Sequence, residues 1–183
     1  PARHALNLRV EENFPERKND FEDPRETLLA YSRRLGWGDS VLGMMTSAPM
    51  GSFRFRVIEE GGVLAAAFLT AGVSNAKRAG EKAESRTHGA RPPAKGTINM
   101  VVATNADMTD AAMAEALMVI TEAKAATLHD LGVKSPYSGL TATGTGTDSA
   151  AVISARGPVR TRFCGKHTLL GEMLAVVTGE SLR

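Results

Sequence analysis

The pattern of hydrophobic and polar positions predicts a β-hairpin in the first half of the chain. Apolar and polar residues alternate over residues 53–58, as in a strand with one buried face. Residues 63–71 form an almost continuous apolar run, which is typical of a strand buried on both faces. Because Gly61–Gly62 separates the two runs, we expect the chain to turn there. The hairpin would bring residues 46–51 beside residues 72–75, at the end away from the turn.

Three helices are expected around the strands. Asp23 before Pro24 is typical of a helix start, and Gly36 of its end. Apolar residues three and four positions apart predict a long helix over residues 110–131 and a last helix over about residues 168–178. The expected apolar stripe of the long helix consists of Met113, Ala116, Leu117, Ile120, Ala123 and Leu131.

Four further strands complete the expected fold. Residues 97–103 are predicted as a central strand and residues 6–10 as a short one. Residues 150–155 and 159–163 are expected to pair as a second hairpin about Gly157. The order of elements predicts an α/β or α+β fold, a single-domain sandwich with a central, largely antiparallel or mixed β-sheet covered by helices.

Size and composition are those of a globular domain. The chain has 183 residues, of which 43% are hydrophobic and 23% charged. We expect a single catalytic domain over residues 41–183 and a lead-in with one helix over residues 1–40. A net charge of +2 and 5% aromatic residues do not favour a nucleic-acid partner. We recognise no signal peptide and no run long enough for membrane insertion. Because Cys164 is the single cysteine, a reducing, cytoplasmic location is expected; a homo-oligomer is left open.

Hydroxyl groups stand at every second position over residues 143–149, with two glycines and Asp148 between them, and this segment concentrates the chemistry of the chain. The candidate hydroxyl nucleophiles are Thr145, Thr147 and Ser149. The second hairpin would place this segment beside residues 165–168, the sequence Gly-Lys-His-Thr. His167 would then lie near Asp148 and at the start of the last helix, whose dipole favours the neutral imidazole that a general base requires.

Other side chains near strand ends are candidates for binding a substrate. Asn75 and Asn105 each follow a strand, and their amides could hold an amide substrate or an oxyanion. Lys166 could hold an anionic centre, and Glu122 lies in the middle of the long helix. Each has a plainer interpretation, as a turn cap or a solvated charge. Cys164 is either a nucleophile or, more commonly for a lone cysteine, a buried small hydrophobic residue.

Several common site motifs are missing from the sequence. Gly165-Lys166 lacks the first glycine and the Ser or Thr of a P-loop, and no GxGxxG fingerprint is present. One cysteine and four widely spaced histidines do not make a structural zinc site. We therefore predict no metal site and no required cofactor, and leave open a catalytic metal held by histidine and carboxylates.

Six segments together resemble the adenosylcobinamide amidohydrolases. In the order and spacing of that family, they are residues 72–80 (GVSNAKRAG), 96–100 (GTINM), 104–105 (TN), 121–124 (TEAK), 142–149 (ATGTGTDS) and 165–168 (GKHT). The resemblance runs from about Thr46 to the C-terminus. It implies an enzyme of cobamide-precursor salvage, which hydrolyses the amide between a corrin propionate side chain and aminopropanol and converts adenosylcobinamide into adenosylcobyric acid.

The residue roles come from chemistry, since the resemblance brings no established catalytic set. We expect His167, oriented by Asp148, to activate a water or the hydroxyl of Thr147 or Ser149. The expected substrate-binding residues are Asn75, Arg78, Asn105, Glu122, Thr145 and Lys166. The planar corrin ring requires a broad apolar cleft, whose rim we expect at the hairpin ends and the basic residues 76–95.

Two alternatives remain at this point. One is a non-catalytic corrinoid-binding protein that shares the scaffold, which would bind cobinamide and release no aminopropanol. The other is an amidohydrolase of a different substrate, which could cleave itself before Thr145 or Thr147, as enzymes with a terminal nucleophile do.

Overall fold

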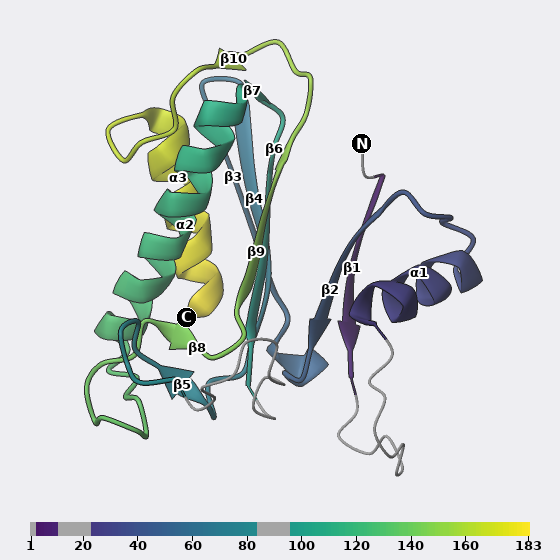
Figure 1. The fold of residues 1–183 in the computed structure, drawn as a ribbon. Helices are drawn as coiled ribbons and strands as arrows, with labels where there is room; N and C mark the ends of the chain where they lie inside the picture. The colour runs from purple at the N-terminus through teal and green to yellow at the C-terminus, as the bar shows by residue number, and fades with distance from the viewer. Residues whose placement is uncertain (1–2, 11–22, 84–95) are drawn as a thin grey trace.

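A computed structural model describes residues 3–10, 23–83 and 96–183, and its elements appear in Figure 1. In chain order the elements are β1 (His4–Arg9), α1 (Pro24–Arg34), β2 (Val41–Thr46), the 3₁₀ turn η1 (Met50–Ser52), β3 (Arg54–Glu60), β4 (Val63–Ala71), β5 (Ala76–Lys77), β6 (Ile98–Thr104), β7 (Asp107–Met108), α2 (Asp110–Asp130), β8 (Gly144–Thr145), β9 (Ser149–Ser154), β10 (Arg160–Thr161) and α3 (Leu169–Leu182).

A four-stranded mixed sheet in the order β3-β4-β6-β9 forms the centre of the fold. Strand β4 is antiparallel to both β3 and β6, and β9 lies parallel to β6. The hairpin of β3 and β4 turns at Gly61 and Gly62, which both adopt positive φ, a conformation that glycine tolerates without strain. The predicted hairpin and the predicted α/β fold around a mixed sheet are confirmed.

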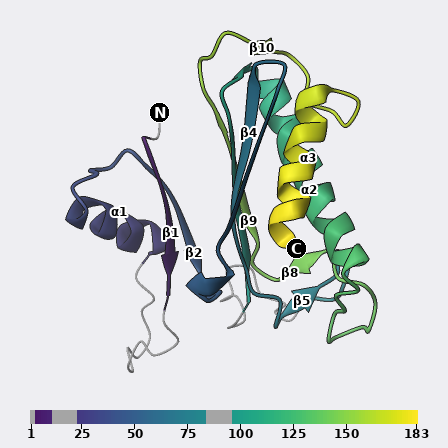
Figure 2. The same cartoon turned by 180° about the vertical axis from the view of Figure 1, so that it is seen from behind.

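Helices α2 and α3 cover one face of this sheet (Figures 1 and 2). Alternate residues of β4 and β6 point into the core, among them Ala65, Met100 and Val102, and pack against Ile120 and Leu174 of the helices. Each buried methionine, valine, isoleucine or leucine side chain contributes about 1.5–3 kcal/mol relative to exposure.

The predicted stripe of α2 is right in its centre and wrong at two positions. Ala116 and Ile120 are buried, whereas Leu117 and Leu131 are 39% and 49% exposed. Lys124 instead continues the buried stripe, with 7% of its surface exposed.

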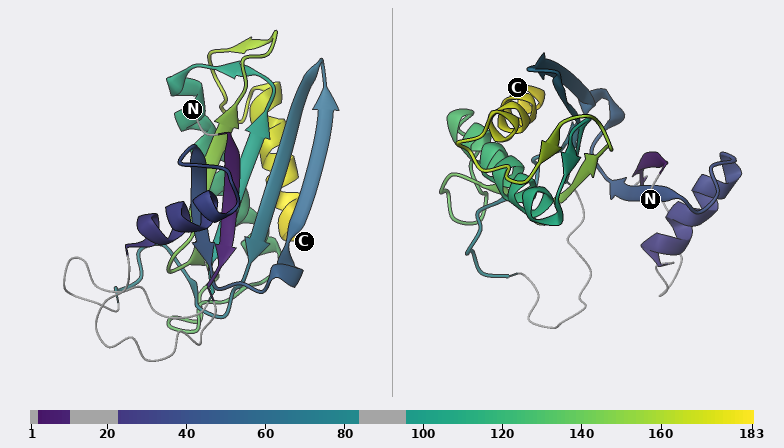
Figure 3. Two further views of the ribbon diagram at one scale, coloured as in Figure 1. Left: turned by 90° about the vertical axis from the view of Figure 1, so that its right-hand side faces the viewer. Right: turned by 90° about the horizontal axis from the view of Figure 1, so that it is seen from above.

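Strands β1 and β2 pair in parallel and lie with α1 on the other side of the central sheet (Figure 3). Strand β1 was expected, but β2 was not. Asn7 of β1 donates to Thr70 Oγ1 and accepts from Asn99 Nδ2 of the sheet, and these bonds join the two layers. The predicted start of α1 is confirmed, because the Asp23 side chain caps it. The division at residue 40 stays a prediction; β1 pairs across it with β2.

The second predicted hairpin is wrong. Residues of β9 pair with β6, and β10 pairs in parallel with β7. Residues 155–159 form no hydrogen-bonded turn, and Gly157 lies against the carbonyl of Asn105, where a Cβ would stand 1.9 Å from that oxygen. The local turn signal favoured a hairpin, whereas pairing with β6, about fifty residues earlier, buries one face of β9 against α2.

Candidate active site

Several motif segments meet at the end of the sheet where β4 stops and β6 begins. Strand β5 pairs with β8, so that Ala76 lies opposite Thr145. Two glycines allow the backbone to lie close to the side chains of Asp148 and Asn75 at this end of the sheet. A Cβ on Gly144 would stand 2.2 Å from Asp148 Oδ2, and one on Gly96 would stand 2.1 Å from Asn75 Oδ1. Any larger residue at either position would displace the side chains that form this corner.

The carboxylate of Asp148 holds the corner together. Oδ2 accepts from Lys124 Nζ at 2.5 Å and from Thr145 N at 3.0 Å, and Oδ1 accepts from Thr145 Oγ1 at 2.5 Å and from Ile98 N at 3.0 Å. The side chains of Asp148 and Lys124 are only 13% and 8% exposed. Four donors occupy the lone-pair directions of the carboxylate, so Asp148 ties the loop to both β6 and α2.

The hydroxyls of the loop have different partners. Thr145 is half-buried and donates to Asp148, so its proton already points at a carboxylate. The Thr147 hydroxyl lies 3.1 Å from Thr97 Oγ1 and 3.2 Å from Gly96 O, and Thr97 in turn donates to the Thr147 carbonyl. Among these residues, Thr145 is therefore the hydroxyl best placed for activation by a carboxylate.

Asn75 has a buried side chain whose amide forms no hydrogen bond with the residues that the structure describes. It is 7% exposed, and neither its Oδ1 nor its Nδ2 has a partner in the described part of the chain. A buried amide without partners costs free energy, about 1–3 kcal/mol for each unsatisfied group. Such a group in a native fold needs an explanation, and readiness to bind a ligand is a physical one.

Arg78 and Ser149 border the same corner. Arg78 Nη1 donates to the carbonyl of Thr141, and its N–H donates to Glu81. The hydrogen bond from Ser138 holds the pKa of the Glu81 carboxyl below its ordinary value, so the loop after β5 is tied to the chain that follows α2. Ser149 is exposed and begins β9, directly after Asp148.

His167 does not lie beside Asp148, contrary to our expectation. Leu169, at the start of α3, is 3.6 Å from the Cβ position of Gly61, at the turn before β4. Asp148 bonds to Ile98, which pairs with Ala71 at the other end of β4. The nine residues of β4 span roughly 26 Å at about 3.3 Å per residue. The two motifs therefore lie at opposite ends of the sheet, as Figure 1 shows for β8 and the start of α3.

The other predicted residues at the far end have structural partners. Asn105 accepts from Leu64 N and donates to Gly62 O, so it caps the β3–β4 turn. Lys166 and Glu122 form an exposed ion pair with each other. His167 is exposed. Its predicted catalytic role stays a prediction, as do the substrate-binding roles predicted for Asn105, Glu122 and Lys166.

Cys164 is fully buried, as the plainer interpretation expects. It has no exposed surface, and burial followed by the charge of Glu115 raises the pKa of its thiol to about 11. A protonated, buried thiol is a poor nucleophile.

Sequence reasoning missed Lys124. The signal was present, because a lone lysine within the stripe that contains Ile120, Thr127 and Leu128 must find a buried acceptor. Its acceptor could not be identified without the fold, since Asp148 follows a long loop.

Within the described ranges, no three side chains of the His, Cys, Asp and Glu types are arranged to hold a metal ion. None of the helices described is both long and apolar enough to cross a bilayer. The expectations on metal, cofactor, compartment and oligomeric state stay predictions.

Comparison with known proteins agrees with the six motifs. Over 88 residues the chain is 42% identical to an uncharacterised protein of Methanocaldococcus jannaschii, an alignment that covers 48% of this chain and 34% of the relative. The aligned part therefore spans about a third of that protein. No solved structure matches the chain. The family model described as adenosylcobinamide amidohydrolase (CbiZ) matches residues 1–183, the whole chain. The chain belongs to the adenosylcobinamide amidohydrolase family.

Proposed function

We propose that this protein hydrolyses the amide between a corrin propionate side chain and aminopropanol in adenosylcobinamide, giving adenosylcobyric acid. Family membership supports amide hydrolysis and a corrinoid substrate. The observation that carries the choice of site is the amide of Asn75, which has no partner among the described residues and lies beside Gly96 in the corner with Thr145 and Asp148. The corner is polar and half-buried, which suits a reaction in which charge develops on a carbonyl oxygen.

In the proposed reaction, Asn75 Nδ2 donates to the carbonyl oxygen of the scissile amide. Thr145 Oγ attacks the carbonyl carbon while its proton passes to Asp148, and an oxyanion forms opposite Asn75. The oxyanion collapses to an ester, the C–N bond breaks, and Asp148 returns the proton to the nitrogen of aminopropanol. Water then hydrolyses the ester, with Asp148 as the base, and regenerates Thr145.

This mechanism moves the reaction centre away from His167. The sequence suggested Lys166 and Arg78 as the basic residues of the site. In this mechanism the basic residue at the reaction centre is Lys124, whose ammonium group compensates the charge of Asp148. Ser149 and Arg78 border the corner and are proposed as substrate contacts, and Thr147 holds the loop through Thr97.

The decisive experiment measures aminopropanol release from adenosylcobinamide by chromatography, with Asn75→Ala beside the unmodified chain. Loss of one oxyanion donor lowers kcat by about 10²–10³. Stability should stay nearly unchanged, since alanine removes two buried polar atoms that have no partner among the described residues, as well as some packing.

Asn105→Ala is the matched control. Both its Oδ1 and its Nδ2 have a hydrogen-bond partner, and it is remote from the corner, so this variant should lose about 1–3 kcal/mol of stability and keep kcat within a few-fold. If Asn75→Ala has full activity, the corner is not the reaction centre. If the unmodified chain binds cobinamide and releases no aminopropanol, the protein is a corrinoid-binding protein and the proposed function fails.

Mass spectrometry separates the two routes to the product. An adduct on Thr145 supports the ester; if Thr145→Ala has full activity, a water molecule is the direct nucleophile. A single full-length species in the intact mass excludes self-cleavage before Thr145 or Thr147.

A further inference from the structure

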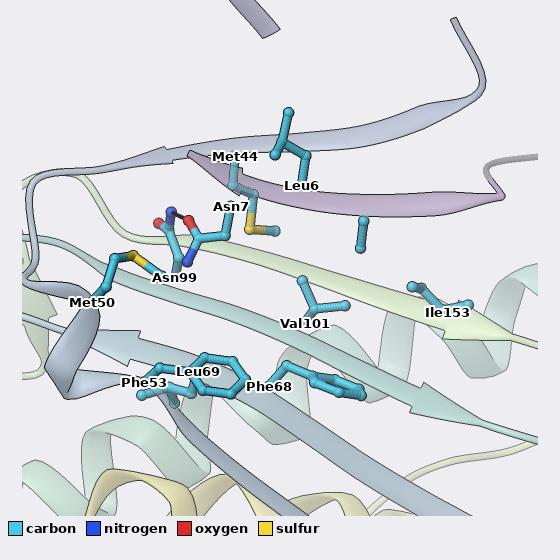
Figure 4. Close-up of a pocket in the computed structure, with 11 residues that line it drawn as sticks. Leu6, Asn7, Met44, Met50, Phe53, Phe68, Leu69, Asn99, Val101 and Ile153 are labelled. Atoms are coloured by element: carbon cyan, nitrogen blue, oxygen red, sulfur yellow. Dashed lines mark hydrogen bonds between the residues drawn. The ribbon is translucent and has the colours of Figure 1, made fainter. Parts of the chain in front are cut away.

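An apolar cleft lies between the β1–β2 pair and the face of the central sheet that the helices leave uncovered. Its volume is about 450 Å³, within the range of about 300–1,000 Å³ that small-molecule sites occupy. The side chains that line it come from both layers and include Leu6, Met44, Phe53, Phe68, Val101 and Ile153 (Figure 4).

Large apolar side chains remain exposed along this face. Phe53, Phe68 and Ile153 are 47%, 39% and 37% exposed, and Phe55 packs against Phe68 with ring centroids 4.8 Å apart. Exposing so much apolar surface on one face costs free energy, and a ligand that covers it regains that cost. The shape and the lining suit one face of a broad, flat molecule.

The cleft has one polar end, which Asn7 and Asn99 form near Met50 (Figure 4). Asn99 Nδ2 donates to Asn7 Oδ1 and to Met45 O, each at 2.8 Å. Asn99 Oδ1 has no donor among the described residues, although Asn99 is only 1% exposed. A buried acceptor without a donor is free to accept from a ligand that brings an N–H or O–H group.

This polar end adjoins the proposed reaction centre. Asn99 pairs with Ser149 across β6 and β9, and Ser149 follows Asp148 directly. Thr97, the partner of Thr147, lies two residues before Asn99, a distance of about 7 Å along the strand. A ligand in the cleft could therefore extend a short side chain around the end of the sheet to Thr145.

We propose that this cleft binds the corrin ring of the substrate, with Asn99 Oδ1 accepting a hydrogen bond from a primary carboxamide on the ring's edge. The inference rests on the proposed function and names its ring-binding site. A corrin ring matches the cleft because it is broad and flat, bears apolar methyl groups and carries primary carboxamides. The propionamide arm then extends past Ser149 to the corner. The ring site thus lies in this cleft. The rim expected at the basic residues 76–95 stays a prediction, and residues 84–95 lie outside the described part of the chain.

The test measures binding apart from hydrolysis. Equilibrium dialysis with adenosylcobyric acid gives the Kd of the ring alone, because this product lacks the scissile amide. The absorbance of the corrinoid measures how much ligand is bound. Ala5→Trp places a large side chain in the cleft from an exposed position, and Phe68→Ala removes a half-exposed ring. Each should raise Kd by about tenfold or more, equivalent to about 1.4 kcal/mol. Leu117→Ala, equally exposed at 39% but on α2, should leave Kd unchanged.

The acceptor is tested by comparing Asn99→Ala with Asn7→Ala. Both break the bond between the two asparagines, but only the first removes Asn99 Oδ1, so it should weaken binding about fivefold more. Equal weakening overturns the acceptor role. Unchanged Kd in Ala5→Trp and Phe68→Ala, with both variants folded by circular dichroism, overturns the ring site even if aminopropanol is released. Cleft-dependent binding without aminopropanol release keeps the ring site and refutes the proposed hydrolysis.

Discussion

The ion pair of Lys124 and Asp148 offers the sharpest test of the corner, through the substitution Lys124→Met. Methionine keeps the volume of the side chain and removes its charge. Breaking a buried pair by removing one partner costs about 3–5 kcal/mol. Asp148 would keep three donors, from Ile98 N and from the N–H and hydroxyl of Thr145, so we expect the lower end, about 3 kcal/mol. For a chain of this size, that corresponds to a fall in Tm of roughly 6–12 °C.

Urea unfolding followed by circular dichroism measures this loss. The matched control is Lys166→Met, which removes the lysine of another ion pair. Its partner there is Glu122, which lies on α2 as Lys124 does. The side chains of that pair are 69% and 53% exposed, so its loss should cost about 0–1 kcal/mol. If Lys124→Met costs no more than the control, the pair does not anchor the loop. In the double variant Lys124→Met/Asp148→Asn the losses should be less than additive, because no unpaired carboxylate remains.

Three further outcomes test the geometry. In urea unfolding, Gly96→Ala should destabilise the fold by about 2 kcal/mol more than Gly80→Ala. Both glycines have a similar positive φ, but only at Gly96 would an added Cβ collide with another atom, Asn75 Oδ1 at 2.1 Å. Equal losses of stability would contradict this close approach. His167→Ala should change kcat/KM by less than about tenfold, whereas a loss of about 10²–10⁴ would return the reaction centre to the start of α3. Burial raises the pKa of the Cys164 thiol from 9.0 to about 11, so the stability that the protonated thiol contributes is complete below pH 9 and is lost as pH rises towards 11. Between pH 9 and 11 the free energy of unfolding should therefore fall more steeply than in Cys164→Ala. Parallel pH profiles of the two proteins would refute this.

Much of the local structure could be predicted because neighbours in sequence determine it. The β3–β4 hairpin follows from two apolar runs around Gly61, and the start of α1 from Asp23. The start of α2 follows from Thr109, whose side chain accepts from Ala112 N. For the site, the sequence singled out the threonine- and glycine-rich loop and Asn75, but it did not identify which residues lie beside them.

The sequence by itself determined the family, the main secondary structure and which segments are rich in polar groups. The tertiary structure decided which of those segments meet. It paired β9 with β6 in place of the nearby β10, separated His167 from Asp148, and brought Lys124 to the carboxylate instead. It also left an apolar face open beside Asn99. The physical reason is that turns and caps depend on residues a few positions apart, whereas strand order and buried ion pairs depend on contacts between residues tens of positions apart, which no local pattern encodes.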